Sequence, residues 1–151
     1  RLGDLHQVIQ QVAQLYSGIR PGVALRTELD PSVPPLNLDA DQMKRALVNL
    51  VDNAVAALGD DDGEIVVSTR YAAASGRVVL QVADTGPGFP PEDRDRAFLP
   101  YYSTKRSSGG LGLAIVNRIV VEHGGEVRIE DNAPRGARLV ISLPALVPAV
   151  A

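Results

Sequence analysis

Two asparagines stand four residues apart in the stretch "MKRALVNLVDNAVAAL", residues 43–58, whose apolar spacing predicts a helix. Residues four apart lie on one helical face, so Asn49 and Asn53 reach the same space. Asparagine is a poor helix former, but its neutral carbonyl oxygen suits a hard cation such as Mg2+. The pair therefore indicates either a solvated polar face, shared with Asp52 and Ala56, or a cation site.

A carboxylate followed by glycines ends a predicted strand at "DTGPGF", residues 84–89. Such a segment is often only a turn. Gly86 and Gly88 also permit positive φ angles and a close approach of the backbone to a ligand. The Asp84 carboxylate can accept a hydrogen bond from the exocyclic amine of a nucleobase. Both a turn and a base-recognition site fit this segment.

A third segment, "SSGGLGLAIV" at residues 107–116, places glycines at the start of an apolar helix. Exposed N–H groups at a helix N-terminus bind anions such as phosphate, and the preceding Lys105 and Arg106 add positive charge. A flexible linker is the alternative, although it leaves unexplained why Gly112 interrupts the apolar run. The spacing matches neither a Walker nor a dinucleotide-binding glycine motif.

The composition limits the remaining choices. The chain has 151 residues, 45% apolar residues and a net charge of −3, which fit one globular domain and disfavour general nucleic-acid binding. It has no cysteine, which excludes disulfides and thiolate metal sites. No signal peptide is visible, and no apolar run approaches the roughly 20 residues that span a bilayer. Because the chain begins with arginine, we expect it to be a fragment of a longer protein.

Hydrophobic periodicity predicts an α+β fold, with about three helices covering one face of a mixed or antiparallel sheet of about five strands. The helices are expected at residues 4–16, 43–58 and 111–125, and the strands at 23–29, 65–71, 77–83, 126–131 and 137–144. Asp39 can cap the second helix. The strands at 65–71 and 77–83 most simply form a hairpin, and the turn "NAPRG", residues 132–136, joins the last two strands. We expect a single domain over residues 1–151, with a mobile loop at 99–110 and a frayed tail at 145–151.

The order of these segments resembles the GHKL ATPase/kinase superfamily, and more closely the catalytic ATP-binding domain of bacterial sensor histidine kinases. "NLVDNAVAAL" resembles the N box, "DTGPGF" the G1 box, "FLPYYSTK" the F box and "GGLGLAIV" the G2 box. The resemblance covers residues 36–144, and "PYYSTK" and "DNAPRGA" look most like the nitrogen-regulation, NtrB/NtrY-like group. It implies a two-layer α/β sandwich of the Bergerat type.

The resemblance also implies roles for individual residues. Asn53 would bind the Mg2+ that bridges the ATP phosphates, and Asn49 would contact phosphate or metal-bound water. Asp84 would recognise the adenine amino group. Residues 94–108 would form a lid over ATP, in which Lys105 reaches phosphate and acts with the two asparagines in catalysis. The remaining implied nucleotide contacts are Gly86, Gly88, Phe98 (which would anchor the lid), Thr104, Gly110, Leu111, Gly112 and Leu113.

Several positions depart from the family pattern. Hydrolysing relatives carry a glutamate at the position of Asn49; an amide cannot accept a proton from water as a carboxylate does, so we expect slow hydrolysis. Ser108 and Gly109 replace the usual glycine and hydroxyl residue, and Ala56 replaces a lysine common in relatives. No His-Glu-x-x-Asn-Pro phosphoacceptor motif is present. The changes at residues 56, 108 and 109 alter positions that the family pattern assigns to the lid and to the phosphate contacts.

The function implied is transfer of the ATP γ-phosphate to a histidine on a helical dimerisation domain that this chain lacks, followed by signalling to a response regulator. We expect a monomeric, cytoplasmic domain without nucleic-acid or membrane contact, whether or not a longer protein is anchored in the inner membrane. The alternative is a nucleotide-binding regulatory module without kinase output, such as a degenerate sensor or an anti-sigma-like switch.

The two histidines, His6 and His123, are expected to be structural. His6 is expected on the surface of the first helix. His123 is expected at a helix C-terminus, where the helix dipole favours a cation.

Overall fold

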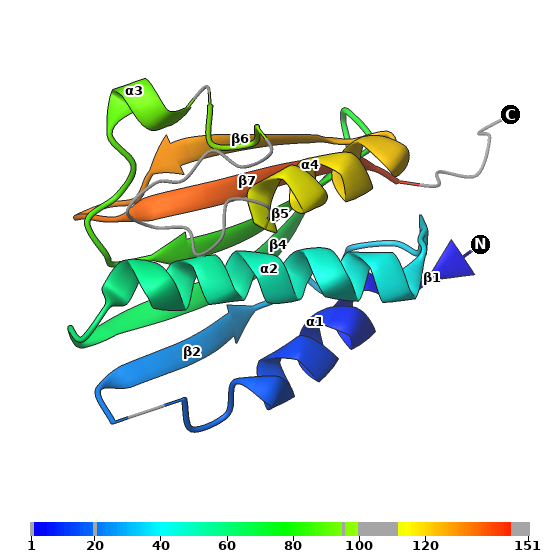
Figure 1. Ribbon diagram of the computed structural model, residues 1–151. Helices are drawn as coiled ribbons and strands as arrows, with labels where there is room; N and C mark the ends of the chain where they lie inside the picture. Colours follow the sequence, from blue (N-terminus) through cyan, green and yellow to red (C-terminus); the bar gives the residue numbers. More distant parts are fainter. Residues whose placement is uncertain (1, 20, 95, 100–111, 146–151) are drawn as a thin grey trace, which may run out of the picture.

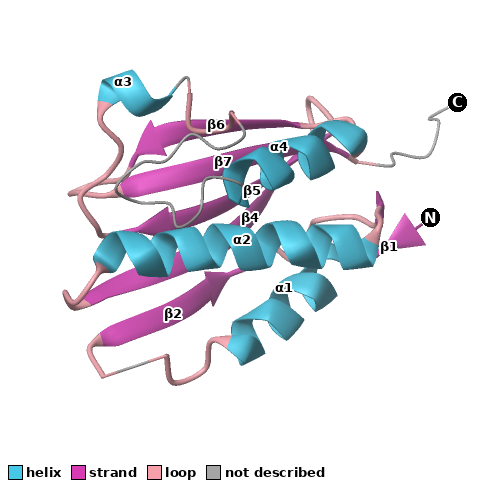
Figure 2. Ribbon diagram, viewed as in Figure 1, coloured by secondary structure: helices cyan, strands magenta, loops and turns pink. Residues whose placement is uncertain are grey.

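The computed structural model describes residues 2–19, 21–94, 96–99 and 112–145 (Figure 1). The helices are α1 (Leu5–Leu15), α2 (Ala40–Leu58), α3 (Pro91–Arg94) and α4 (Gly112–Glu122). The strands are β1 (Leu2–Gly3), β2 (Val23–Glu28), β3 (Leu36–Asn37), β4 (Gly63–Ala72), β5 (Arg77–Asp84), β6 (Glu126–Asp131) and β7 (Ala137–Pro144). Helices α1, α2 and α4 lie together over one face of the sheet, which confirms the predicted α+β class (Figure 2).

The main sheet has five strands in the order β2-β4-β5-β7-β6. Strands β2 and β4 are parallel, whereas the other three neighbouring pairs are antiparallel. The two predicted hairpins, β4–β5 and β6–β7, are therefore confirmed, and the sheet is mixed. The short pair β1–β3, which the sequence did not predict, forms a separate two-stranded sheet. Strand β1 comes directly before α1, and β3 lies at the end of the connector that follows β2.

The alternation of side chains along β5 determines where the strand's last residue points. Residues two apart in a strand face the same side of the sheet. Val78, Leu80 and Val82 are buried on the face covered by the helices, and Asp84 continues the same series. A carboxylate is thus carried into the helix-facing layer by the same alternation that buries the core. The large side chains at the centre of that core include Met43, Leu47, Leu50, Ile65, Ile119 and Ile141.

Helix α2 begins and ends as its sequence predicts. Asp39 is the N-cap, and its carboxylate accepts a hydrogen bond from the Gln42 backbone N–H at 3.1 Å. The helix ends at Gly59, whose φ is +57°. The Asp39 backbone N–H donates to Nε2 of His123 at 3.0 Å, and Nδ1 of His123 lies 2.8 Å from the Ile119 carbonyl oxygen.

These two bonds fix the orientation of the His123 ring, because Nε2 accepts a hydrogen bond from Asp39 and Nδ1 donates one to Ile119. His123 therefore joins the end of α4 to the start of α2, and its structural role agrees with the prediction. The partner of Nε2 is a backbone N–H of another element, which the helix dipole alone did not predict. His6 is half-buried, and its Nε2 lies 2.9 Å from Oγ1 of Thr69.

Asp30 anchors the connector after β2 to the sheet. Its carboxylate accepts hydrogen bonds from the backbone N–H of Tyr71 at 2.9 Å, and from the backbone N–H and hydroxyl of Ser32 at 2.9 and 2.7 Å. The bond from Tyr71, followed by those from Ser32, lowers the pKa of Asp30 to about 2. The ionised carboxylate is the form that these donors stabilise.

We expect Asp30→Asn to destabilise the domain at neutral pH and to have less effect in acid. A folded-state pKa of about 2 lies below the unfolded value of about 3.9, so Asp30 contributes stability above pH 4. That contribution falls as the pH drops from about 4 to about 2. Urea unfolding of both proteins at pH 7, 4 and 2.5 measures the difference. A gap between them that stays constant with pH would contradict this role.

Two predicted segments lie largely outside the described residues. The expected loop at 99–110 and the expected tail at 145–151 fall there, apart from Leu99 and Ala145. The first residue of the predicted third helix, residue 111, falls there as well. No helix among the described residues combines the length and apolar character needed to cross a membrane.

Candidate functional site

The asparagine-bearing face of α2 is only partly open to solvent. Asp52 and Ala56 are exposed, Asn49 is half-buried, and Asn53 is 7% exposed. The interpretation of this face as fully solvated, one of the two that the sequence allowed, is therefore wrong for Asn53. Ala57 follows Asn53 by one helical turn, and its carbonyl oxygen would lie 3.1 Å from a Cβ placed on Gly86. This face of α2 thus leads directly to the loop that follows β5.

That loop, residues 84–88, holds the Asp84 carboxylate in a fixed orientation. Asp84 is 1% exposed, and its Oδ1 accepts hydrogen bonds from the backbone N–H of Gly86 at 2.9 Å and of Ala137 at 3.4 Å. Gly88 has a φ of +81°, which favours glycine, and a Cβ there would lie 3.1 Å from the Gly136 carbonyl oxygen. The loop is therefore tightly packed on both sides.

The start of α4 is less closely packed than the loop after β5. Among the described residues, no atom lies within 4 Å of the position that a Cβ on Gly112 would take. Packing against the described part of the protein does not require a glycine there, which is consistent with space kept for a ligand. Leu113 is buried in the core. Phe98 is half-buried and packs against the same hydrophobic core. The other predicted contacts, Thr104, Lys105, Gly110 and Leu111, lie outside the described residues.

Sequence reasoning missed the residues that hold the loop from the other side. They belong to the β6–β7 turn, residues 132–136, which the sequence predicted only as a turn and as part of the family resemblance. Asn132 Nδ2 donates to the Asp84 carbonyl oxygen at 2.9 Å, and Arg135 Nε donates to the Gly86 carbonyl oxygen at 2.9 Å. The Gly-Ala pair at the start of the last strand was the only local signal of a close approach.

Thr85 was also missed. Its Oγ1 accepts a hydrogen bond from the Glu64 backbone N–H at 3.0 Å. A Cβ on Gly63 would lie 2.7 Å from that oxygen. The loop is thereby fastened to the beginning of β4 as well as to the β6–β7 turn.

The residues present fit a nucleotide with a magnesium ion. Nδ2 of Asn49 is buried and has no hydrogen-bond partner among the described residues, and rotation of the amide presents Oδ1 there instead. Such an orphaned group is satisfied when a ligand supplies its partner. Among the described residues, no group of three or more His, Cys, Asp and Glu side chains gathers to hold a metal. An amide oxygen is a neutral oxygen ligand that suits Mg2+ alongside phosphate oxygens and water.

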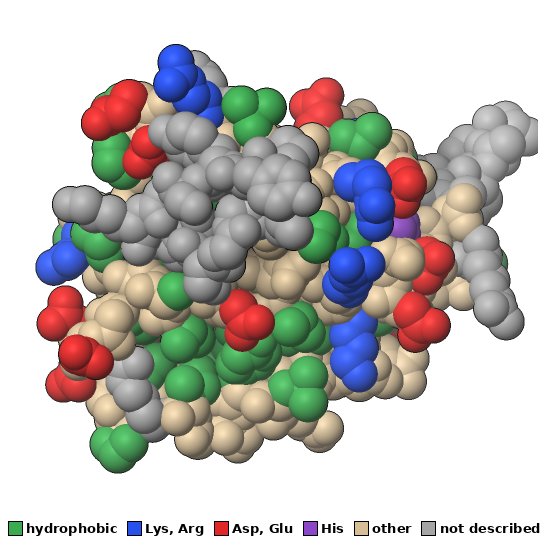
Figure 3. Space-filling model, viewed as in Figure 1, with side chains coloured by type: hydrophobic (Ala, Val, Ile, Leu, Met, Phe, Trp, Pro, Cys, Tyr) green, Lys and Arg blue, Asp and Glu red, His purple; other side chains and the backbone are tan. Residues whose placement is uncertain are grey.

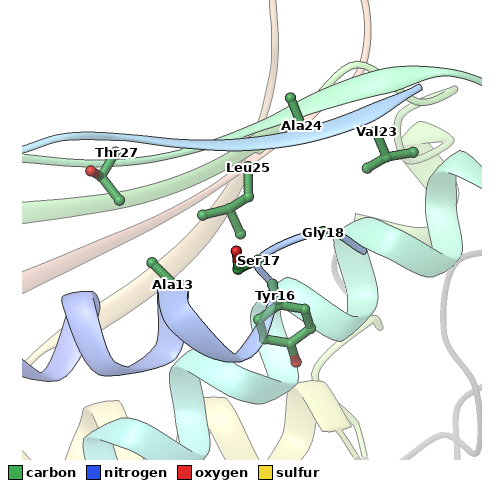
Figure 4. A pocket seen from close by; sticks show the side chains of 8 residues that line it. All are labelled: Ala13, Tyr16, Ser17, Gly18, Val23, Ala24, Leu25 and Thr27. Carbon is green, nitrogen blue, oxygen red and sulfur yellow. The ribbon is translucent and has the colours of Figure 1, made fainter. Parts of the chain in front are cut away.

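A separate hollow lies between the end of α1 and the edge strand β2. Its volume is about 350 Å3, and none of the predicted site residues lines it. Figure 4 shows Leu25 pointing from β2 toward α1, with Ala13 and Tyr16 opposite. Hydrophobic side chains gather on the neighbouring surface over α1, α2 and β2 (Figure 3).

Tyr16 closes the helical side of this hollow by joining α1 to α2. Its hydroxyl donates to Asp52 Oδ1 at 2.5 Å and lies 3.3 Å from the Val48 carbonyl oxygen. Burial, and then the hydrogen bond to Asp52, raise the pKa of Tyr16. Asp52 is therefore directed toward α1, away from the amides of its neighbours on α2.

The fold and these contacts define a two-layer α+β domain whose polar site lies between α2 and the end of β5. The chain belongs to the family of histidine kinase-, DNA gyrase B- and HSP90-like ATPases, whose pattern matches residues 38–147. The predicted family membership is confirmed.

Among its relatives, the chain is 38% identical to the sensor histidine kinase ZraS of Klebsiella oxytoca over 93% of this chain and 30% of that protein. It is 33% identical to the sensory histidine kinase/phosphatase NtrB of Vibrio alginolyticus over 95% of this chain and 43% of that protein. The chain therefore spans less than half the length of these relatives.

Two solved structures have the same fold. Full-length ShkA, crystallised in complex with AMPPNP, superposes with a TM-score of 0.84 and 30% identity, covering 99% of this chain and 32% of ShkA. The histidine kinase ThkA, crystallised with the response regulator protein TrrA, superposes with a TM-score of 0.80 and 27% identity, covering 96% of this chain and 41% of ThkA. Both similarities extend over almost the whole of this chain.

Proposed function

We propose that this domain binds Mg-ATP and that, within a longer sensor kinase, it donates the γ-phosphate to a histidine on a helical dimerisation domain. The observation that carries the proposal is the buried Asp84 carboxylate beside the asparagine-bearing face of α2. It is supported by the family of the chain, by the histidine kinase names of its relatives, and by the AMPPNP in the related ShkA crystal.

The proposed roles follow from the chemistry of each side chain. Asp84 accepts a hydrogen bond from the adenine amino group, and Gly86 and Gly88 let the loop backbone lie against the base. Asn53 holds Mg2+, which when bound neutralises phosphate charge and orients the γ-phosphoryl group. Asn49 contacts phosphate or metal-bound water. The remaining proposed contacts are Phe98, Thr104, Lys105, Gly110, Leu111, Gly112 and Leu113.

The same site should hydrolyse ATP slowly. Asn49 lies one turn before Asn53 on the same face of α2, where a carboxylate could take a proton from an attacking water. A neutral amide cannot accept that proton. Catalysis in this domain then consists of positioning and electrostatic stabilisation, and the acceptor histidine comes from another domain.

The proposed partners are ATP, the helical dimerisation domain and a response regulator. The last is suggested by ThkA, which was solved with the response regulator TrrA. The relatives named NtrB suggest a role in nitrogen regulation, while ZraS, which does not carry that name, is similar in sequence over a comparable share of this chain. We propose that the domain itself is monomeric and cytoplasmic.

Calorimetry with ATP and ADP, with and without Mg2+, tests the proposal directly. We expect binding by the wild-type domain and almost no turnover. Asn53→Ala should lower the Mg2+-dependent affinity by about tenfold or more, because a metal ligand is lost, while metal-free binding changes by less than about twofold. Asn37→Ala, which changes an exposed asparagine of β3, is the matched control and should leave both affinities unchanged.

Each part of the proposal can fail separately. Absence of nucleotide binding by the folded wild-type domain would refute it as a whole. Equal losses with and without Mg2+ would remove Asn53 from the metal site. Binding without phosphotransfer, when the domain is joined to a helical domain carrying the phosphoacceptor histidine of a relative, would favour the regulatory module instead.

A further inference from the structure

The β6–β7 turn, residues 132–136, holds the loop after β5 through hydrogen bonds to two of its peptide groups. Asn132 Nδ2 donates to the carbonyl oxygen of Asp84, which belongs to the peptide between residues 84 and 85. Arg135 Nε donates to the carbonyl oxygen of Gly86, which belongs to the peptide between residues 86 and 87. Both bonds are 2.9 Å long. The turn therefore fixes the first and the third of three successive peptides.

The middle peptide of the three supplies the bond that orients the Asp84 side chain. Its N–H, that of Gly86, donates to Asp84 Oδ1 at 2.9 Å. Because the flanking peptides are each held by the turn, this N–H has little freedom to rotate away. Pro87 has no N–H group, so the carbonyl of Gly86 is the only hydrogen-bonding group of the third peptide. The orientation of the carboxylate thus depends on bonds made two peptides apart.

Close backbone packing leaves the turn and the loop no room to slide past each other. A Cβ on Gly136 would lie 1.8 Å from the Asp84 carbonyl oxygen, and one on Gly88 would lie 3.1 Å from the Gly136 carbonyl oxygen. The turn is itself closed by the Asn132 backbone N–H, which donates to the Gly136 carbonyl oxygen at 3.0 Å. These close backbone contacts fix the position of the turn relative to the loop.

We propose that Asn132 and Arg135 are positioning residues for recognition of the nucleotide base. They act through Asp84 and need not touch the ligand: they hold its carboxylate where a base amino group can donate to it. This inference rests on the proposed function. An adenine amine needs an acceptor at that place, whereas guanine presents a carbonyl oxygen at the corresponding ring position. Loosening the loop should therefore reduce the preference for adenine more than the binding of phosphate.

The test measures affinities of the 151-residue domain for Mg-ATP and Mg-GTP in the variants Asn132→Ala and Arg135→Ala. Each variant should weaken ATP binding by about three- to tenfold, the usual effect of losing one hydrogen bond. The ratio of ATP to GTP affinity should fall by a similar factor. Arg135→Lys should recover part of the loss, since its ammonium can also donate to the Gly86 carbonyl.

Arg128→Ala is the matched control in the same hairpin. It removes an arginine of β6 whose Nε donates to Glu130 at 2.6 Å, away from the loop. It should leave the ATP-to-GTP ratio unchanged. In the ligand-free domain, the NMR resonance of the Gly86 amide should shift in Arg135→Ala and stay in place in Arg128→Ala. This second measurement remains decisive if Asn132→Ala does not fold, because the Arg135 side chain lies in an exposed turn.

Equal losses of ATP and GTP affinity, or an ATP affinity within twofold of wild type in both alanine variants, would overturn the positioning role while leaving the proposed function intact. A folded wild-type domain that binds neither nucleotide would overturn both. An unchanged Gly86 amide in Arg135→Ala would also overturn the role of that residue.

Discussion

Asp84→Asn should lower the affinity for Mg-ATP by about a hundredfold or more, the largest effect we expect from any single change. The side chain is 1% exposed, so water cannot replace a lost acceptor. Asparagine is nearly the same size, and its Oδ1 can still accept from the Gly86 and Ala137 N–H groups that Asp84 Oδ1 uses. Its Nδ2 would then face the base amino group, and two donors repel each other.

Calorimetry measures this loss, and thermal unfolding establishes that the variant is folded. Asp60→Asn is the matched control because it removes the same charge at an exposed position in the turn after α2. It should bind Mg-ATP like the wild type. An Asp84→Asn domain that retains wild-type affinity would show that this carboxylate does not recognise the base.

Gly136→Ala should destabilise the domain by about 3 kcal/mol or more, the range reached when strain and overlap combine at a buried position. The new Cβ would lie 1.8 Å from the Asp84 carbonyl oxygen, which is backbone and cannot rotate away. The residue also has a φ of +107°, a conformation that side chains disfavour. Relief requires that the β6–β7 turn separate from the loop, so nucleotide affinity should fall as well.

Gly18→Ala separates the two causes. Gly18 also has a positive φ, +67°, but no described atom lies within 4 Å of the position of a Cβ there. Its substitution should therefore cost only the conformational part, about 1 kcal/mol. Urea unfolding followed by circular dichroism gives both values. If the two variants lost the same stability, the close contact between Gly136 and Asp84 would not exist in solution.

Much of the fold follows from local patterns in the sequence. The apolar spacing in residues 43–58 and the cap at Asp39 predicted α2, and the strand alternation predicted both hairpins. The direction of the Asp84 side chain also follows from local alternation, since it continues the series of Val78, Leu80 and Val82. These features depend on neighbours within one element, which is why the sequence alone could predict them.

Contacts between residues far apart in the chain could not be predicted from local sequence patterns. The environment of His123 is an example: the helix dipole favoured a cation, whereas the Asp39 N–H, 84 residues away in the chain, donates to the ring. Asn53 is another, because helical spacing gave its direction but not its burial. Which element covers a given face is decided by packing across the whole domain.

The sequence by itself determined the α+β class, the order of the motifs, and the residue types available for nucleotide chemistry at Asn49, Asn53 and Asp84. Only the tertiary structure revealed that the β6–β7 turn holds the loop of Asp84 through Asn132 and Arg135. Those partners are 48 and 49 residues apart in the chain. The pairing of β5 with β7 brings them together, and no local periodicity encodes a contact that depends on the register of two distant strands.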